Sequence, residues 1–101
     1  MVRALTEAYD RIFAEADLIR MPTIPQTAHK MLALPEESRT EHIVQALNMV
    51  RNTAAFDLTG HPSISVHVRA VTGLPIGLML TGAQFDDATV MRVAHAYETA
   101  N

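Results

Sequence analysis

The amino-acid sequence predicts a mixed α/β fold with about three strands and three to four flanking helices in a single segment, residues 1–101. Polar and apolar residues alternate strictly over 62–68, and a second apolar run follows over 74–80, a combination typical of a β-hairpin. Apolar residues recur at three- and four-residue steps near both chain ends, as on one face of a helix. The hydrophobic share of 49% is enough for a modest aliphatic core.

The first helix is expected over residues 2–16, where the apolar side chains lie on one face. They are Leu5, Tyr9, Ile12, Phe13 and Ala16. The next stretch, 17–21, is short and mostly apolar, and Pro22 closes it. Because Pro22 and Pro25 both restrict the backbone, we expect a buried strand that continues into a rigid extended loop.

A second helix is expected after Ser38. Ser38 and Glu41 have the spacing of a capping box, in which each side chain satisfies a free backbone donor of the other residue. Residues 26–37, before this box, carry mixed signals and predict only a weak helical turn or loop. The helix should end near Asn52, and its apolar residues should form a buried face. These residues are Ile43, Val44, Leu47 and Val50.

The second half of the chain predicts the hairpin and a last helix. One side of the first hairpin strand should be buried, because Ile64, Val66 and Val68 alternate with Ser63, Ser65 and His67. Residues 69–73 form a short connection, and Gly82 ends the second strand. Gly77 inside that strand predicts either a bulge or a close approach of another stretch of backbone. Asp86 is placed to cap the final helix, whose apolar residues are Val90, Val93, Ala94 and Tyr97.

The outer strands of the expected small sheet predict that another strand or another part of a protein pairs with them. Two outer strands would carry unpaired backbone groups, and an apolar edge favours pairing with another strand. The sequence therefore predicts either a missing remainder of the fold or self-association with a second copy. Both partners stay open on this evidence.

Charge and composition exclude several classes of protein. The formal net charge is −3, and one Lys and seven Arg are spread along the chain, so no stretch is basic enough for a nucleic-acid binder. The absence of cysteine excludes disulfides, thiolate metal sites and Cys nucleophiles. No apolar run reaches the roughly 18 residues of a membrane span, and the N-terminus is unlike a signal peptide. We therefore expect no membrane partner and a cytoplasmic location.

The polar residues offer weak candidates for chemistry. None of the five histidines has a second ligand at the spacing of a zinc site. A Ser–His–Asp set could be assembled from Ser63, His95 and Asp57, although no Gly-x-Ser-x-Gly motif surrounds a serine. Two carboxylate pairs, Glu36–Glu37 and Asp86–Asp87, lie at expected helix starts, where the helix dipole favours anions. We therefore expect no metal and no cofactor.

Four segments of the sequence carry a family resemblance. They read D-L-I-R-M-P-T-I-P over 17–25, N-T-A-A-F-D-L-T-G-H-P-S-I-S-V over 52–66, G-L-P-I-G-L-M-L-T-G over 73–82 and F-D-D-A-T-V-M-R-V-A-H-A-Y-E over 85–98. These segments resemble the C-terminal region of the amidase-signature family, whose second segment reads approximately N-T-A-P-F-N-L-T-G-H-P-A-I-S-V. The four segments follow one another in the family's order and spacing and cover nearly the whole chain.

The resemblance implies amide-bond hydrolysis on a large mixed α/β fold, of which this chain would form a part. It also implies a catalytic set of one Lys, a Ser in a cis peptide and a nucleophilic Ser, all upstream of the matched region. Lys30 does not lie in the family's Lys context, and Ser38, Ser63 and Ser65 lie outside any Gly/Ser-rich run. No catalytic residue is therefore assigned, and this chain alone is expected to be inactive.

The resemblance further implies that this region packs on the catalytic core and forms part of the substrate-pocket wall. The stretch Asn52–Leu58 is the expected contributor, with Thr53 and Phe56 as the substrate-binding residues. The sequence departs from the family pattern at Ala55, where Pro is common, and at Asp57, where Asn is usual. The Asp57 carboxylate should be either solvated or paired with a neighbouring cation.

Three functional hypotheses follow from these observations. In the first, the chain is the C-terminal portion of an amidase-signature hydrolase and contributes scaffold and pocket wall. In the second, it is a stand-alone binding or structural module that self-associates through its sheet edges. In the third, it is an independent hydrolase that uses Ser63 and His95.

Overall fold

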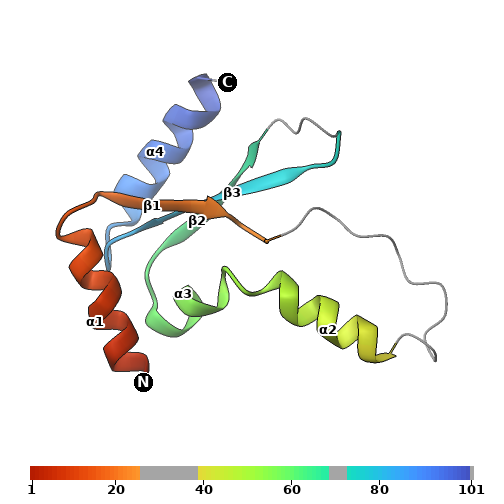
Figure 1. Cartoon of the computed structure of the whole chain (residues 1–101). Coiled ribbons are helices and arrows are strands. Elements are labelled where there is room, and N and C mark those ends of the chain that lie inside the picture. Colours follow the sequence, from red (N-terminus) through yellow and green to blue (C-terminus); the bar gives the residue numbers. More distant parts are fainter. Residues whose placement is uncertain (26–38, 69–72, 101) are drawn as a thin grey trace.

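The computed structural model describes residues 1–25, 39–68 and 73–100, which form four helices and three strands (Figure 1). The helices are α1 (Val2–Phe13), α2 (Arg39–Met49), α3 (Ala54–Thr59) and α4 (Asp87–Ala100). The strands are β1 (Leu18–Pro22), β2 (Ser63–Val68) and β3 (Ile76–Gly82). The predicted mixed α/β class is confirmed. The expectations for residues 26–37, for Ser38 in the capping box and for the start of the hairpin connection lie outside the described residues.

The three strands form one antiparallel sheet in the order β1–β3–β2. Strand β2 pairs with β3 so that Ile64 lies opposite Leu80 and Val68 opposite Ile76, which confirms the predicted hairpin. Strand β1 pairs with the other side of β3. The central strand is therefore β3, and β1 and β2 are the two edges of the described sheet.

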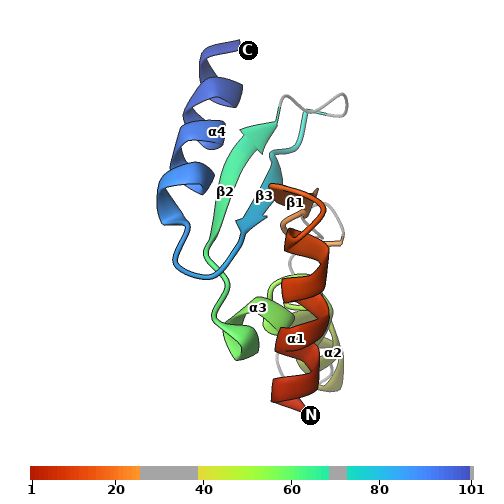
Figure 2. The ribbon, with the colours of Figure 1, turned by 90° about the vertical axis from the view of Figure 1, so that its left-hand side faces the viewer.

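Helix α4 covers one face of this sheet (Figure 2). Because side chains alternate across a strand, the apolar set of β2 faces α4 while its serines lie on the opposite face. The buried core between helix and sheet consists of Val66, Leu80 and Ala94, with Ile64, Leu78 and Tyr97 packed around it. Asp86 directly precedes α4, and its Oδ1 accepts a hydrogen bond from the Thr89 hydroxyl at 2.8 Å.

Helix α3 is a short element that the sequence pattern did not predict. Its six residues make fewer than two turns, too few for a helical period to become visible. Gly60 ends the helix with φ of 79°, and its N–H donates to the carbonyl of Phe56 at 2.8 Å. Glycine adopts this left-handed cap most easily because it has no Cβ. Helix α1 was predicted to residue 16 and ends at Phe13.

The predicted burial of α2 is wrong. The helix is present at the expected place, but none of its residues is buried. The exposed fractions of Ile43, Val44, Leu47 and Val50 are 57%, 49%, 62% and 46%. In Figure 1, α2 extends away from the sheet, and no described helix or strand packs closely on its apolar side. The periodicity therefore predicted an amphipathic helix correctly, while the surface that would cover it is absent from the described residues.

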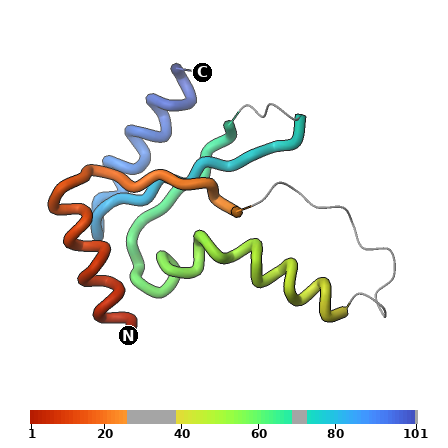
Figure 3. The backbone as a smooth tube through the Cα atoms, in the orientation of Figure 1, coloured from red at the N-terminus to blue at the C-terminus, as the bar shows by residue number. Residues whose placement is uncertain are grey.

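The described elements form a flat, open arrangement (Figure 3). Its principal extents are 47 × 38 × 16 Å, and its radius of gyration is 16.0 Å. A compact domain of 100 residues has a radius of gyration of about 13 Å. The elements are therefore spread more widely than in an independent domain of this length.

Gly77 does not form a bulge, and two side-chain hydroxyls lie close to it. The pairing of β2 with β3 continues through Gly77, which lies opposite His67. A Cβ atom on Gly77 would lie 2.7 Å from both Ser65 Oγ and Thr23 Oγ1. These two hydroxyls are hydrogen-bonded to each other across the backbone of Gly77. The predicted bulge is therefore absent, and the nearest atoms to this position belong to side chains and not to an approaching backbone.

Replacing Gly77 with Ala should lower the free energy of unfolding by about 1–3 kcal/mol, because the new methyl group would push apart the two bonded hydroxyls. Urea denaturation measures this change. The matched control is the same substitution in a Thr23→Ala, Ser65→Ala background, where both oxygen atoms are gone and the cost should be much smaller. An equal cost in both backgrounds would show that these hydroxyls are not the cause.

Candidate functional site

The segment predicted to line a substrate pocket, residues 52–58, leads from α2 into α3. Asn52 ties it to the sheet, because its Nδ2 donates to the carbonyl of Pro22 at 2.8 Å. Thr53 is half-buried, and its hydroxyl donates to the carbonyl three residues earlier at 3.3 Å. Phe56 is buried, with 5% of its surface exposed. Thr53 and Phe56 thus lie on one anchored segment, and their contact with a substrate stays a prediction.

Phe56 belongs to a ring cluster that we call the His61 cluster, formed by Tyr9, Phe13, Phe56 and His61. The ring centroids of Tyr9 and Phe56 are 4.9 Å apart, and those of Phe13 and His61 are 5.3 Å apart. The rings of Tyr9 and Phe56 both meet His61 edge-on. The cluster joins α1 to α3 and to the residues just before β2, so it holds the predicted pocket segment in place.

Both ring nitrogens of His61 are hydrogen-bonded. Nε2 lies 2.9 Å from Asp10 Oδ1, and Nδ1 lies 2.7 Å from Thr59 Oγ1. A carboxylate only accepts, so Nε2 donates to Asp10; in the neutral ring Nδ1 then accepts the proton of the Thr59 hydroxyl. A further hydrogen bond joins Gln84 to the end of α3, since Gln84 Nε2 donates to the carbonyl of Thr59 at 2.7 Å.

A carboxylate, an imidazole and a hydroxyl in a row also form the arrangement that activates a nucleophile in many hydrolases. Here the His61 side chain is 0% exposed and Thr59 is 8% exposed, so a substrate has no access to the hydroxyl. Only Asp10, at the far end from the hydroxyl, is exposed. The arrangement therefore acts as a structural clamp between α1 and α3. The sequence pattern missed it because Asp10 and His61 are 51 positions apart.

The alternative set of Ser63, His95 and Asp57 is not brought together. The Ser63 hydroxyl lies 2.7 Å from Thr81 Oγ1, on the sheet face opposite α4. His95 is an exposed residue of α4, and Asp57 is exposed on α3, where it forms no ion pair with a described residue. The Asp57 carboxylate is therefore solvated. The structure gives no support to the independent-hydrolase hypothesis.

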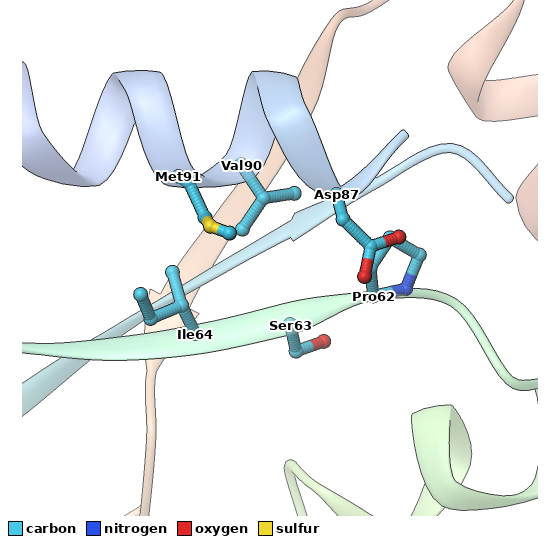
Figure 4. A pocket seen from close by; sticks show the side chains of 6 residues that line it. All are labelled: Pro62, Ser63, Ile64, Asp87, Val90 and Met91. Atoms are coloured by element: carbon cyan, nitrogen blue, oxygen red, sulfur yellow. The ribbon is translucent and has the colours of Figure 1, made fainter. Parts of the chain in front are cut away.

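A hollow of about 240 Å³ lies between the start of α4 and β2 (Figure 4). It is lined by Pro62, Ser63, Ile64, Asp87, Val90 and Met91. Ile64 points toward α4 in this view while Ser63 points away, so the walls are mostly apolar and Asp87 is the charged group. Across residues 1–25, 39–68 and 73–100, no group of three His, Asp or Glu side chains is placed to hold a metal ion.

Among the residues that the structure describes, no helix is both long and apolar enough to cross a membrane.

Comparison with known proteins agrees with the sequence motifs. The amidase family model matches residues 1–91. The chain is 48% identical over 91 residues to an uncharacterized protein in the nthA 5′ region of Rhodococcus erythropolis, covering 90% of this chain and 45% of that protein. It is 46% identical over 101 residues to an enantioselective amidase of Rhodococcus rhodochrous, covering 99% of this chain and 19% of the amidase.

A solved structure shows the same arrangement of elements. The chain superposes on a subunit of glutamyl-tRNA(Gln) amidotransferase from Thermotoga maritima with a TM-score of 0.68 and 27% identity, covering 92% of this chain and 19% of that one. The chain thus spans about a fifth of the length of the enantioselective amidase and of the Thermotoga protein. The match over residues 1–91 confirms the resemblance found in the sequence. This chain therefore belongs to the amidase family, and it corresponds to the C-terminal part of amidase-signature proteins.

Proposed function

We propose that this chain contributes the C-terminal scaffold and part of the substrate-pocket wall of an amide hydrolase. The Lys, Ser and Ser groups that cleave the C–N bond would lie in the rest of that enzyme's fold. The observation that carries the proposal is the match of residues 1–91 to the amidase family, together with the one-fifth share of the enantioselective amidase. The flat, open shape supports it, because such a shape fits a piece packed on a larger core.

The test uses a pair of polypeptides. One is this chain, and the other is the Rhodococcus rhodochrous amidase without its matched C-terminal fifth, which we call the shortened amidase. The co-expressed pair should hydrolyse amides, and this chain alone should not. Release of ammonia from a panel of primary amides measures the reaction. Turnover by the purified chain alone would overturn the proposal.

We propose Thr53 and Phe56 as the pocket residues. Two contacts support this: Asn52 fixes the segment to the sheet, and the His61 cluster fixes Phe56. The half-buried Thr53 hydroxyl is then the polar group that a bound amide would meet. Phe56 would shape the wall from behind, because its ring is packed on Tyr9.

In the active pair, Thr53→Val should raise KM for the amide more than it lowers kcat, because a polar contact made in the bound ground state is lost. Thr53→Ser keeps the hydroxyl and is the matched control, so it should leave KM nearly unchanged. Initial-rate kinetics on one primary amide separate the two constants. Equal KM values for Thr53→Val and the unchanged pair would remove Thr53 from the pocket.

We propose the cytoplasm as the compartment. The sequence contains no cysteine, as is common among proteins that do not depend on disulfides. Fractionation of cells that produce the tagged chain, with blotting of each fraction, tests this location. Recovery in the periplasmic or secreted fraction would contradict it.

A further inference from the structure

The apolar side of α2 is an exposed hydrophobic surface among the described residues. We call it the α2 face: Ile43, Val44 and Leu47 of the helix and Val50 just after it. Each of these side chains keeps between 46% and 62% of its surface exposed. None carries a charge, and they recur at the three- and four-residue steps that place them on one side of a helix. A contiguous apolar face of this kind marks an interaction surface.

Helix α2 also has no close packing partner among the described helices and strands. No residue of α2 is buried, and no described helix or strand packs closely against it. An isolated helix shorter than about 12–15 residues is only marginally stable in water, and α2 has 11. The Asn52–Pro22 hydrogen bond joins the residues just after the helix to β1. Packing on a further apolar surface would therefore add stability that the described helices and strands do not give α2.

The comparisons indicate which surface this is. In the enantioselective amidase the matched region is 19% of the chain, so about four fifths of that fold lies outside it. The same share holds for the solved Thermotoga structure, on which the described elements superpose with a TM-score of 0.68. We propose that the α2 face docks on an apolar surface of the remaining four fifths of an amidase core. This inference rests on the proposed function and assigns the contact to four named side chains.

The experiment compares two substitutions that add the same charge to α2. Leu47→Glu puts a carboxylate in the centre of the α2 face, where burial against an apolar partner is strongly unfavourable. Gln45→Glu is the matched control, because at 3.6 residues per turn it lies about 160° around the helix from Leu47. Each tagged chain is co-expressed with the shortened amidase, and the amount of shortened amidase retained on the tag is measured with the amide turnover.

Leu47→Glu should reduce retention and turnover at least about tenfold, and Gln45→Glu should leave both near the level of the unchanged chain. Leu47 is 62% exposed, so the substitution should not change the far-ultraviolet circular dichroism of the free chain. An unchanged spectrum shows that loss of retention is not caused by unfolding. Full retention of the Leu47→Glu chain would overturn the docking of α2 while leaving the proposed function intact. Failure of the unchanged chain to retain the shortened amidase would instead overturn the proposed function. A dimer of the free chain that Leu47→Glu abolishes, without effect on the pair, would assign the α2 face to a second copy.

Discussion

Co-expression of this chain with the shortened amidase should restore amide hydrolysis to at least about a hundredfold above the background of either polypeptide alone. The expected effect is large because each of the two polypeptides supplies something that the reaction needs and the other polypeptide lacks. The shortened amidase would supply the groups that attack the C–N bond, and this chain would supply the surface that fixes their geometry. Small displacements of catalytic groups cost large factors in rate, so an incomplete core should be nearly inactive.

Two controls make this result specific. The intact enantioselective amidase sets the upper limit of turnover, and the shortened amidase expressed with an unrelated small protein sets the lower limit. This amidase is chosen as the partner because its matched region is 46% identical to this chain. A pair that associates but stays at the lower limit would support the scaffold role and contradict the contribution to the pocket.

Replacing His61 with Ala should lower the free energy of unfolding by about 3 kcal/mol. The substitution removes both hydrogen bonds of the imidazole and leaves a gap among three packed aromatic rings. The buried Thr59 hydroxyl would also lose its partner, and an unsatisfied buried group adds to the cost. Thermal or urea denaturation followed by near-ultraviolet circular dichroism measures the change, because Tyr9 and Phe56 report on the cluster.

His67 provides the matched control for this substitution. It is an exposed histidine on β2, so His67→Ala should change the free energy of unfolding by no more than about 0.5 kcal/mol. Asp10→Asn keeps an oxygen acceptor for His61 Nε2 but removes the negative charge. Its free energy of unfolding therefore separates the contribution of the charge from that of the hydrogen bond. A His61→Ala chain as stable as the His67→Ala chain would show that the His61 cluster does not hold α1 in place.

Local pattern predicted the hairpin and helix α4 well. Alternation in β2 depends on which face of the sheet is buried, and α4 of the same chain covers the face that carries Ile64 and Val66. The pattern failed for the burial of α2, because Leu47 lies on a helix that no described element covers. It also failed for α3, whose limits depend on the left-handed cap at Gly60 and not on any period.

The candidate site was accessible to sequence reasoning only in part. Family motifs pointed to residues 52–58 as the proposed pocket segment, and the structure shows the contacts of Asn52 and Phe56 that anchor this segment. No local signal pointed to the contact of Asp10 with His61, because it joins the first helix to a residue just before β2. Long-range contacts of this kind depend on how α1 packs, and no local pattern in the sequence reveals that packing.

The native mass of the purified pair tests the central claim most directly. If this chain is the C-terminal part of an amidase fold, native mass spectrometry should show one copy of it bound to one copy of the shortened amidase. The mass of the complex should then exceed the mass of the shortened amidase by 11.1 kDa, the mass of one intact copy of this chain. A complex containing only copies of this chain, with the shortened amidase unbound, would contradict the account and favour self-association.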